Sequence, residues 1–327
     1  MQSPVEKLNL IWIQLLNAEE RAHSSKWIRL LRSPFWYPVS MVFSHVLYPL
    51  MKKEWRKEVT TFFGIPMTVA LPSGTDILLN GIKSHDSEIR LSKFLTRQLQ
   101  PGQIFIDIGA HHGYYTLLAS SLVGQNGKVY SVEASRHSFE LLQYNTIQYN
   151  TIQYNTIQYN SSTYHNIKIY HNAASDQLGE IVFYEYPGPY AEYNTMVKGS
   201  YDHAIWRSKV EETVTRVDTI ILDNLIEENG ISKATIKIDV EGGEYVVLKG
   251  LGRSLSHGNF TIIMEYLYST DTGNFHHRAV TLLKETGYSA HYINAVGELE
   301  CVENIDDYLR KEKLDSDNLV FRLPSSP

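Results

Sequence analysis

One ten-residue segment, Ile104–Gly113, limits what this chain can fold into more than any other part of it. Its first five residues, Ile-Phe-Ile-Asp-Ile, are typical of a buried parallel strand, and a helix is predicted over Tyr114–Val123. The turn between them carries Gly109 and Gly113, which lack a Cβ and let backbone approach a ligand closely. An open α/β sheet presents its carboxyl edge to a nucleotide in this way. Only two of the three glycines of the dinucleotide pattern are present, so the turn alone is also compatible with an ordinary strand–helix connection.

The next predicted strand, Lys128–Val132, ends at an acidic residue, Glu133. A carboxylate at the tip of the second strand can accept hydrogen bonds from both ribose hydroxyls of a nucleoside. The alternative is a solvated acid that the N-terminal dipole of the following helix favours. Because strand, glycine turn, helix, strand and acid occur in the expected order, we favour the ribose contact.

Three acids follow a later central strand, Ile236–Ile238, and surround a Gly-Gly turn: Asp239, Glu241 and Glu244. Carboxylates this close repel, so at least one is expected to have a raised pKa, which suits a general base or an acceptor of hydrogen bonds from a substrate. The alternative is helix capping by Glu241 and Glu244. The strand Phe260–Glu265 repeats the pattern of a buried strand that ends in an acid.

Further patterns complete the predicted sheet. A third strand leads to an edge of small residues that could frame a flat base, where Asp176 can contact the exocyclic amine of that base. A long loop rich in aromatic residues follows and is typical of a lid. The predicted segments are the strands Ile167–Tyr170 and Gly179–Tyr184, the lid Glu185–Val210, the helix Thr219–Glu228, to which Val214–Val217 leads, and a final antiparallel hairpin of Tyr288–Ile293 and Asn318–Arg322.

Composition excludes several classes of protein. The 327 residues, 43% of them apolar, can bury a sizeable core, and a net charge of −6 gives no footprint for nucleic acid. Cys301 is the single cysteine, so neither an internal disulfide nor a cysteine zinc site is expected. No metal site is predicted, since no spacing among the acids is diagnostic. Met1–Glu6 lacks the features of a signal peptide, and we expect a cytoplasmic protein.

The first 60 residues differ from the rest: they hold nine Lys/Arg against five Asp/Glu. Within them, residues 34–51 are uncharged and lie between basic clusters, but prolines and His45 interrupt the run, which is too short for a spanning helix of about 20 residues. Residues 29–57 can therefore lie on an anionic membrane surface, at the inner face of the membrane. The favoured alternative is a helical appendage, residues 1–60, that packs on the domain of residues 61–327 or on a second subunit, which leaves a homodimer open.

Residues 143–157 are three copies of Gln-Tyr-Asn-Thr-Ile, and residues 158–160 begin a fourth. A five-residue period turns a helix by about 500°, so Tyr and Ile spiral around it and form no single apolar stripe. We interpret residues 143–160 as an expanded insertion without a chemical role, which lengthens the helix after the second strand or forms a loop.

Taken together and in order, four motifs resemble the FkbM-type S-adenosylmethionine-dependent methyltransferases over about residues 81–323. The motifs are Asp107–Thr116, Val132–Glu133, Ala173–Asp176 and Lys237–Glu244. The resemblance implies a seven-stranded, mostly parallel, Rossmann-like class I methyltransferase sheet and O-methylation, often of sugars or natural products. It also implies that the turn from Asp107 cradles the methionine part of the cofactor.

By the same resemblance, Glu133 holds the ribose and Asp176 lies near the adenine. The cofactor contacts expected from the motifs are Asp107, Gly109, Ala110, His111, Gly113, Glu133, Ala134 and Asp176. Three features depart from the family pattern. They are the histidine pair in the first turn, where Asn and an aliphatic residue are common, the absence of a proline after Glu133, and the Gln-Tyr-Asn-Thr-Ile copies, which interrupt a helix that the family keeps short.

Methyl transfer to a hydroxyl requires alignment of the acceptor oxygen and removal of its proton. Asp239 and Glu241 are the candidates for base or orienting group, His111 is a weaker one, and Glu244 and Glu265 are expected to contact a small-molecule or glycan acceptor. Two other functions share this sheet: a nicotinamide-dependent oxidoreductase, for which the third glycine is missing, and a membrane- or partner-associated binding protein with weak turnover.

Overall fold

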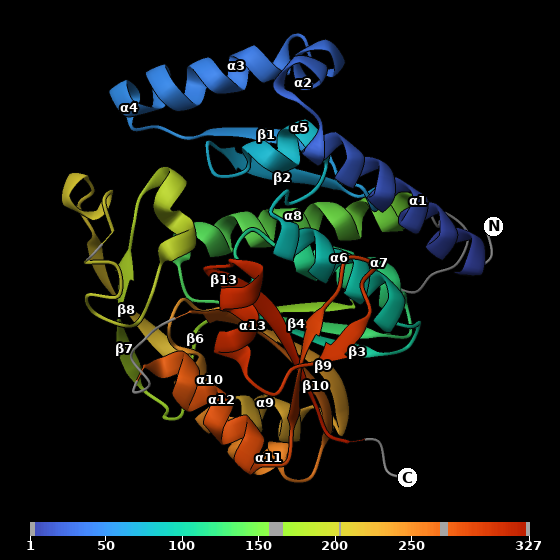
Figure 1. The fold of residues 1–327 in the computed structure, drawn as a ribbon, viewed down its shortest axis with the longest axis vertical. Helices are drawn as coiled ribbons and strands as arrows, with labels where there is room; N and C mark the ends of the chain where they lie inside the picture. Colours follow the sequence, from blue (N-terminus) through green and yellow to red (C-terminus); the bar gives the residue numbers. More distant parts are fainter. Residues whose placement is uncertain (1–3, 157–165, 203, 269–273, 325–327) are drawn as a thin grey trace.

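An eight-stranded sheet forms the centre of the computed structural model, which describes residues 4–156, 166–202, 204–268 and 274–324 (Figure 1). The strand order is β12-β11-β13-β10-β9-β3-β4-β5, and the strands from β10 to β5 are parallel. The predicted seven-stranded sheet with antiparallel last strands is confirmed, and short β12 adds an eighth at the edge. The strands are β3 Ile104–Ile108, β4 Lys128–Glu133, β5 Ile167–His171, β9 Lys233–Ile238, β10 Asn259–Leu267, β11 Ser289–Ile293, β12 Leu299–Cys301 and β13 Ser316–Arg322.

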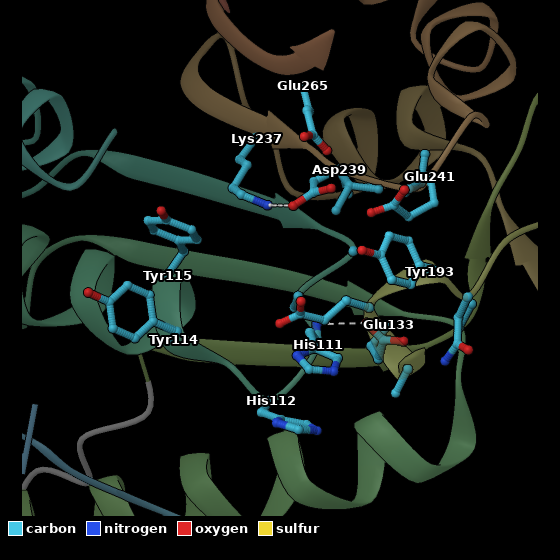
Figure 2. Close-up of a pocket in the computed structure, with 18 of the residues that line it drawn as sticks. His111, His112, Tyr114, Tyr115, Glu133, Tyr193, Lys237, Asp239, Glu241 and Glu265 are labelled. Carbon is cyan, nitrogen blue, oxygen red and sulfur yellow. Dashed lines mark hydrogen bonds and ion pairs between the residues drawn. The ribbon is translucent and has the colours of Figure 1, made fainter. Parts of the chain in front are cut away.

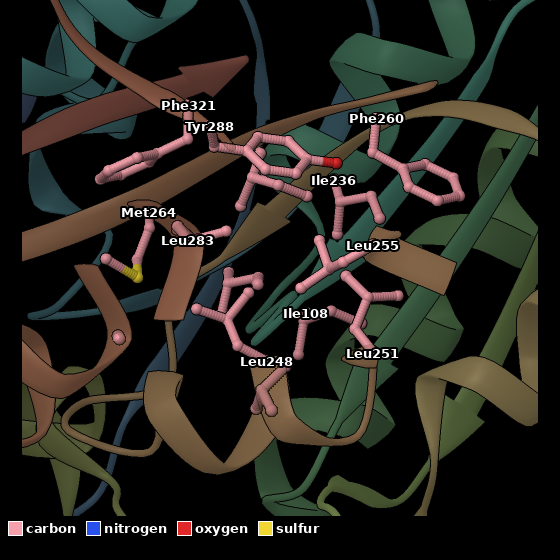
Figure 3. Packing of buried hydrophobic residues seen from close by; sticks show 14 of the residues in the cluster. Ile108, Ile236, Leu248, Leu251, Leu255, Phe260, Met264, Leu283, Tyr288 and Phe321 are labelled. Atoms are coloured by element: carbon pink, nitrogen blue, oxygen red, sulfur yellow. The ribbon is translucent and has the colours of Figure 1, made fainter. Parts of the chain in front are cut away.

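Helices cover both faces of this sheet, and the strand pleat divides the core between them. Phe105 packs on one face, whereas Ile106 and Ile108 pack on the other, where Leu248 and Leu251 cover them (Figure 3). The first face carries α1 Pro4–His23, α6 Asp86–Gln98, α7 Tyr114–Val123 and α8 Arg136–Thr156. The second carries α9 Leu222–Glu228, α10 Glu244–Lys249, α11 Gly252–Leu255, α12 Phe275–Glu285 and α13 Ile305–Glu312.

A smaller sheet of β6 Ala173–Ala174, β8 Thr213–Ile220 and β7 Glu180–Glu185 stands beside the carboxyl edge of the main one. Because β8 continues to Ile220, helix α9 begins at Leu222, later than predicted. The predicted lid lies between β7 and β8 and contains two short 3₁₀ helices, η2 Gly188–Tyr193 and η3 Arg207–Lys209.

The N-terminal region forms a separate layer above α8 and α5 (Figure 1). After α1, which packs on α6, the chain makes a helical rod and then a two-stranded hairpin. The rod consists of α2 Lys26–Arg32, α3 Trp36–Val42, the π-helical turn η1 Phe43–Leu47 and α4 Tyr48–Met51, and the hairpin of β1 Trp55–Thr60 and β2 Pro66–Leu71 leads to α5 Thr75–Asn80. Within the described ranges, every helix is too short or too polar to cross a bilayer.

The repeat extends α8 as far as Thr156, as one of the two predicted forms requires, and residues 157–160 lie outside the described residues. Its first copy is part of the folded core: Asn145 is fully buried, and Gln148 from the start of the second copy hydrogen bonds Glu58 of β1. The repeat therefore begins inside the domain and is not wholly an external insertion.

Gly109→Ala is expected to destabilise the protein strongly. A Cβ at this position would lie 1.8 Å from the carbonyl oxygen of Asp239, and φ is +78°. We expect a loss of about 2–4 kcal/mol of unfolding free energy, measured by chemical denaturation. Gly64→Ala is the matched control, because φ there is +77° but nothing lies within 4 Å; it should lose about 1 kcal/mol. Equal losses would show that the close approach at Gly109 is not tight.

Candidate functional site

A cavity of about 380 Å³ opens at the carboxyl edge of the main sheet, within the size range of small-molecule sites. The turns after β3 and β9 form its floor, and the hairpin, α5, α7 and the lid complete its wall (Figure 2). Eight of the residues predicted for the site line it: Gly109, Ala110, His111, Glu133, Ala134, Asp239, Glu241 and Glu265.

The turn after β3 is tied to the tip of β4 by Glu133. Its Oε2 accepts a hydrogen bond from the His111 backbone N–H at 2.7 Å, and its Oε1 accepts one from the Ser135 N–H at 2.8 Å. Burial raises the pKa of Glu133 to about 7, although these two N–H groups act in the opposite direction. Each carboxylate oxygen retains a further lone pair, so Glu133 can still accept hydrogen bonds from a diol.

His111 is a turn residue, because its φ of +50° places it in the left-handed region. Its ring stacks on that of His112, with centroids 3.7 Å apart, and Nε2 of each ring is buried without a hydrogen-bond partner. Burial and then Lys83 lower the pKa of His111 to about 3, so the imidazole is neutral. A neutral ring in this wall is a poor base, which leaves His111 as a flat surface for a ligand.

Asp107 and Gly113 act behind the cavity wall, not in it. The pleat directs the Asp107 side chain toward α7, where Oδ2 accepts a hydrogen bond from Thr116 at 2.7 Å while Oδ1 stays buried and unpartnered. A Cβ on Gly113 would lie 2.7 Å from Leu142 Cδ1, so this glycine lets α8 pack against the start of α7. Both residues shape the turn that the cavity residues occupy.

Asp176 does not reach the cavity. It forms an ion pair with Lys249 of α10, and the wall at this end consists of Asn172, Ala173 and Ala174. The ion pair holds Asp176 outside the cavity, so this geometry does not support the predicted base contact through Asp176.

Glu244 is also placed differently from the prediction. It is buried at the start of α10, and Oε1 accepts hydrogen bonds from the Val240 and Gly242 N–H groups at 3.3 and 3.2 Å. It stabilises the turn after β9 and not the N-terminus of α10, which has no side-chain cap, and it does not line the cavity. Instead of contacting an acceptor, it orders the loop that carries Glu241.

Three acids meet at the opposite end of the cavity from Glu133. Oxygens of Asp239, Glu241 and Glu265 all lie within 4.8 Å of one another. The ammonium of Lys237 lies 2.8 Å from Asp239 Oδ2, and the side chain of Lys237 is almost fully buried (Figure 2). A cation could occupy such a group of oxygens, but an acidic cluster by itself does not indicate one, and here Lys237 already compensates part of the charge.

The three acids differ in basicity. Burial alone would raise the pKa of Asp239, but Lys237 and Lys83 lower it below its ordinary value. Burial, with Asp239 adding its charge, raises the pKa of Glu265 to about 8. Burial, Glu265 and Asp239 together raise the pKa of Glu241 well above the usual range. The site thus combines one ionised carboxylate with two carboxyls that readily hold a proton.

A network that sequence reasoning missed borders these acids. Lys83 lies 3.1 Å from Glu88 Oε2, which also accepts a hydrogen bond from Tyr115 at 2.7 Å. Burial disfavours a charged Lys83, but Glu88, Glu192 and Asp239 raise its pKa well above normal. The one local signal was Lys237, a charged residue between two isoleucines in the buried part of β9.

The lid closes the acidic end with aromatic side chains. Tyr201 hydrogen bonds Glu241, and Thr195 Oγ1 donates to the Glu241 carbonyl at 2.7 Å. Tyr193 lines the cavity and packs against Trp206 with centroids 5.1 Å apart. The predicted lid is therefore joined to the same turn that carries the acids.

Asn145, from the first repeat copy, holds the histidine turn from behind. Its Nδ2 donates to the His112 carbonyl at 2.8 Å and to the Thr68 carbonyl at 3.0 Å, and its Oδ1 accepts from the Thr68 N–H at 2.8 Å. The Asn145 amide thus bonds both the N–H and the carbonyl of Thr68, as a residue of a neighbouring strand would. Through the His112 carbonyl it connects strand β2 to the cavity floor.

The Glu133 end of the cavity fits a nucleoside. The carboxylate can take a diol, and the unpartnered buried Nε2 of His111 offers one polar contact in the wall. Asn172 and Ala173 form a small-residue edge that a flat base can lie against. These residues belong to three adjacent parallel segments, which is the usual arrangement for nucleotides at such sheets.

The model of a family described as "Methyltransferase FkbM domain" matches residues 107–290. No curated protein matches the chain.

Among solved structures, the chain is similar to a methyltransferase FkbM from Methylobacillus flagellatus KT (15% identity, 77% of this chain and 56% of that one, TM-score 0.40). It is also similar to precorrin-6y C5,15-methyltransferase from Geobacter metallireducens GS-15 (15%, 73% and 88%, TM-score 0.38). An O-methyltransferase from Bacillus cereus in complex with SAH is a third (14%, 73% and 83%, TM-score 0.39). At these TM-scores the matches add nothing to the fold described above.

Asn145→Ala is expected to lower the free energy of unfolding by about 2–4 kcal/mol, because it leaves three buried backbone groups without partners. Chemical denaturation measures the loss. Deletion of residues 148–152 is the matched control, since the repeat then leaves the sequence of residues 136–155 unchanged. If the deletion lowers the free energy of unfolding as much as Asn145→Ala does, the stability depends on the length of α8 and not on the Asn145 amide.

Proposed function

The chain belongs to the FkbM methyltransferase family, and from that premise we propose that it methylates a hydroxyl group of a sugar, glycan or secondary metabolite. Its cofactor is S-adenosylmethionine, which supplies a methyl group already activated by the sulfonium charge. The protein must hold this cofactor, align the acceptor oxygen and remove a proton from it.

The cofactor end of the proposed site is the Glu133 end of the cavity. Glu133 would hold the ribose hydroxyls, Ala134 and Asn172 would border the nucleoside, and the turn from Gly109 to His111 would border the methionine part. All of these contacts except Asn172 were expected from the family motifs. Asn172 takes the place of Asp176, which is paired with Lys249.

The observation that carries O-methylation is the acidic cluster at the other end. A hydroxyl needs a proton acceptor, and a carboxylate whose pKa is raised to about 8 is a much better one than an ordinary glutamate. We assign Glu265, next to Glu241, as the proton acceptor. Asp239 is held ionised by Lys237 and acts as the orienting group, since a lowered pKa makes it a weak base.

The acceptor class follows from the density of polar groups around this cluster. Carboxylates, two lysines and the Tyr193 hydroxyl line one small volume, which suits a molecule with several hydroxyl groups. The Tyr193 ring adds an apolar face of the kind on which a sugar ring can pack. A nicotinamide-dependent oxidoreductase, the alternative of the same fold, is set aside because the family is a methyltransferase family.

Turnover should depend on the ionisation of Glu265. Because only its ionised form can accept the proton, kcat/KM is expected to rise with pH and to level off above about 8. Glu265→Gln should lower kcat about 10²–10⁴-fold and remove this rise. A pH–rate profile of both proteins, with the best acceptor found, measures the effect.

Stability provides the control for that experiment. The folded-state pKa of Glu265 is raised, so the carboxyl stabilises the fold fully below its ordinary pKa, and this stabilisation is lost as pH rises through about 8. Glu265→Gln should therefore be at least as stable as wild type at high pH.

Asp239→Asn should cut turnover with cofactor affinity nearly intact, and unchanged turnover in both variants would contradict the assignment.

An acceptor screen tests the function itself. Purified protein with methyl-labelled S-adenosylmethionine should label members of a panel of small glycans, lipids and secondary metabolites, and Glu265→Gln should not. Calorimetric titration should show binding of S-adenosylmethionine and not of NAD. Cofactor binding without labelling of any hydroxylated compound would favour the remaining alternative, a binding protein with weak turnover.

A further inference from the structure

The N-terminal rod carries large apolar side chains that nothing in the described part of the chain covers. Trp27, Leu31 and Leu50 are 77%, 79% and 78% exposed, and Phe35 and Met51 are also exposed. They come from α2, the start of α3 and α4, which together form the outermost layer of the molecule (Figure 1). Isolated exposed apolar residues are ordinary, but several large ones on one layer indicate a surface that is covered in use.

The long helix of this rod, residues 36–51, is apolar on both sides. Its inner side, with Phe43 and Tyr48, packs on Leu71 of β2 and Leu78 of α5. Val42, Val46, Leu47, Leu50 and Met51 are nevertheless exposed, and Val42, Leu47 and Met51 line an apolar hollow with Phe43 and Trp55. No residue from 34 to 51 is charged. A helix that is hydrophobic all round belongs in a core or in lipid, and here only one side has a core to pack against.

Basic residues surround this apolar surface. Residues 26–57 contain seven Lys/Arg and one acid, Glu54, whereas residues 61–327 have a net excess of negative charge. Lys52 and Lys53 follow directly after Met51 and are exposed, and Lys57 lies 4.6 Å from the centre of the Trp36 ring. The molecule is therefore electrically polarised, with its positive end at the apolar layer.

We propose that the outer surface of α2, α3 and α4 binds the surface of an anionic lipid bilayer. Apolar side chains would enter the boundary between headgroups and acyl chains, and the lysines would contact lipid phosphates. The acidic body would be repelled, which fixes the orientation. A second copy of the chain fits less well, because a two-fold symmetric contact uses the same surface of both copies and would bring two surfaces of equal positive charge together.

Flotation of the full-length protein with vesicles tests this proposal. The protein should float with vesicles of phosphatidylcholine and phosphatidylglycerol, less with phosphatidylcholine alone, and less at high salt. Leu50→Ser with Met51→Ser should weaken binding about tenfold or more, and Lys52→Gln with Lys53→Gln about fivefold for each lysine. All four residues are exposed, so the fold should persist, as circular dichroism can confirm.

Matched controls come from other exposed sites. Leu178→Ser, at a side chain that is 66% exposed in the bend before β7, and Lys233→Gln with Lys311→Gln should float as wild type does. The proposal is overturned if wild type does not float with anionic vesicles, or if the Leu50→Ser/Met51→Ser protein floats equally well. It is also overturned if ultracentrifugation shows a dimer that those two substitutions dissociate, because a second copy would then cover the surface.

Discussion

The site depends on one close approach between two backbones. The Asp239 N–H donates to the Ile108 carbonyl at 3.0 Å, and the Asp239 carbonyl lies where any Cβ on Gly109 would be. This contact brings the turn after β3 against the turn after β9. Glu133 and the acidic cluster of Asp239, Glu241 and Glu265 consequently line one cavity, although about 130 residues of chain separate Gly109 from Asp239.

Charge compensation is the second requirement of this arrangement. Carboxylates crowded at the ends of β9 and β10 would repel one another. Their charge is compensated by two lysines, the buried Lys237 and the partly buried Lys83, and by protons that remain bound to the carboxyls. Lys237 and Lys83 keep Asp239 ionised, and the proton therefore remains with Glu265 or Glu241. The difference in basicity on which the proposed chemistry relies arises from this uneven distribution of cations.

Local patterns were sufficient to predict much of the fold. β3 and α7 have the predicted bounds, because a buried strand, a glycine turn and a helix are each encoded by adjacent residues. Glu133, Asp239, Glu241 and Glu265 were predicted for the same reason: each follows a recognisable strand. Directions of side chains were harder to predict, since Asp176 and Glu244 follow equally clear patterns but bind Lys249 and backbone N–H groups. Lys83, Glu88 and Asn145 reach the site through tertiary contacts that no local pattern reports.

The repeat in α8 has a genetic consequence. Asn145 lies in the copy nearest the start of the helix, and identical copies follow it. Loss or gain of one unit during replication, which removes or adds whole codons, recreates the same amide at the same distance from the helix start. Each unit shifts only the far end of the helix, by about 7.5 Å along its axis. Natural variants of this chain can thus differ in helix length while the residues around the cavity remain under unchanged selection.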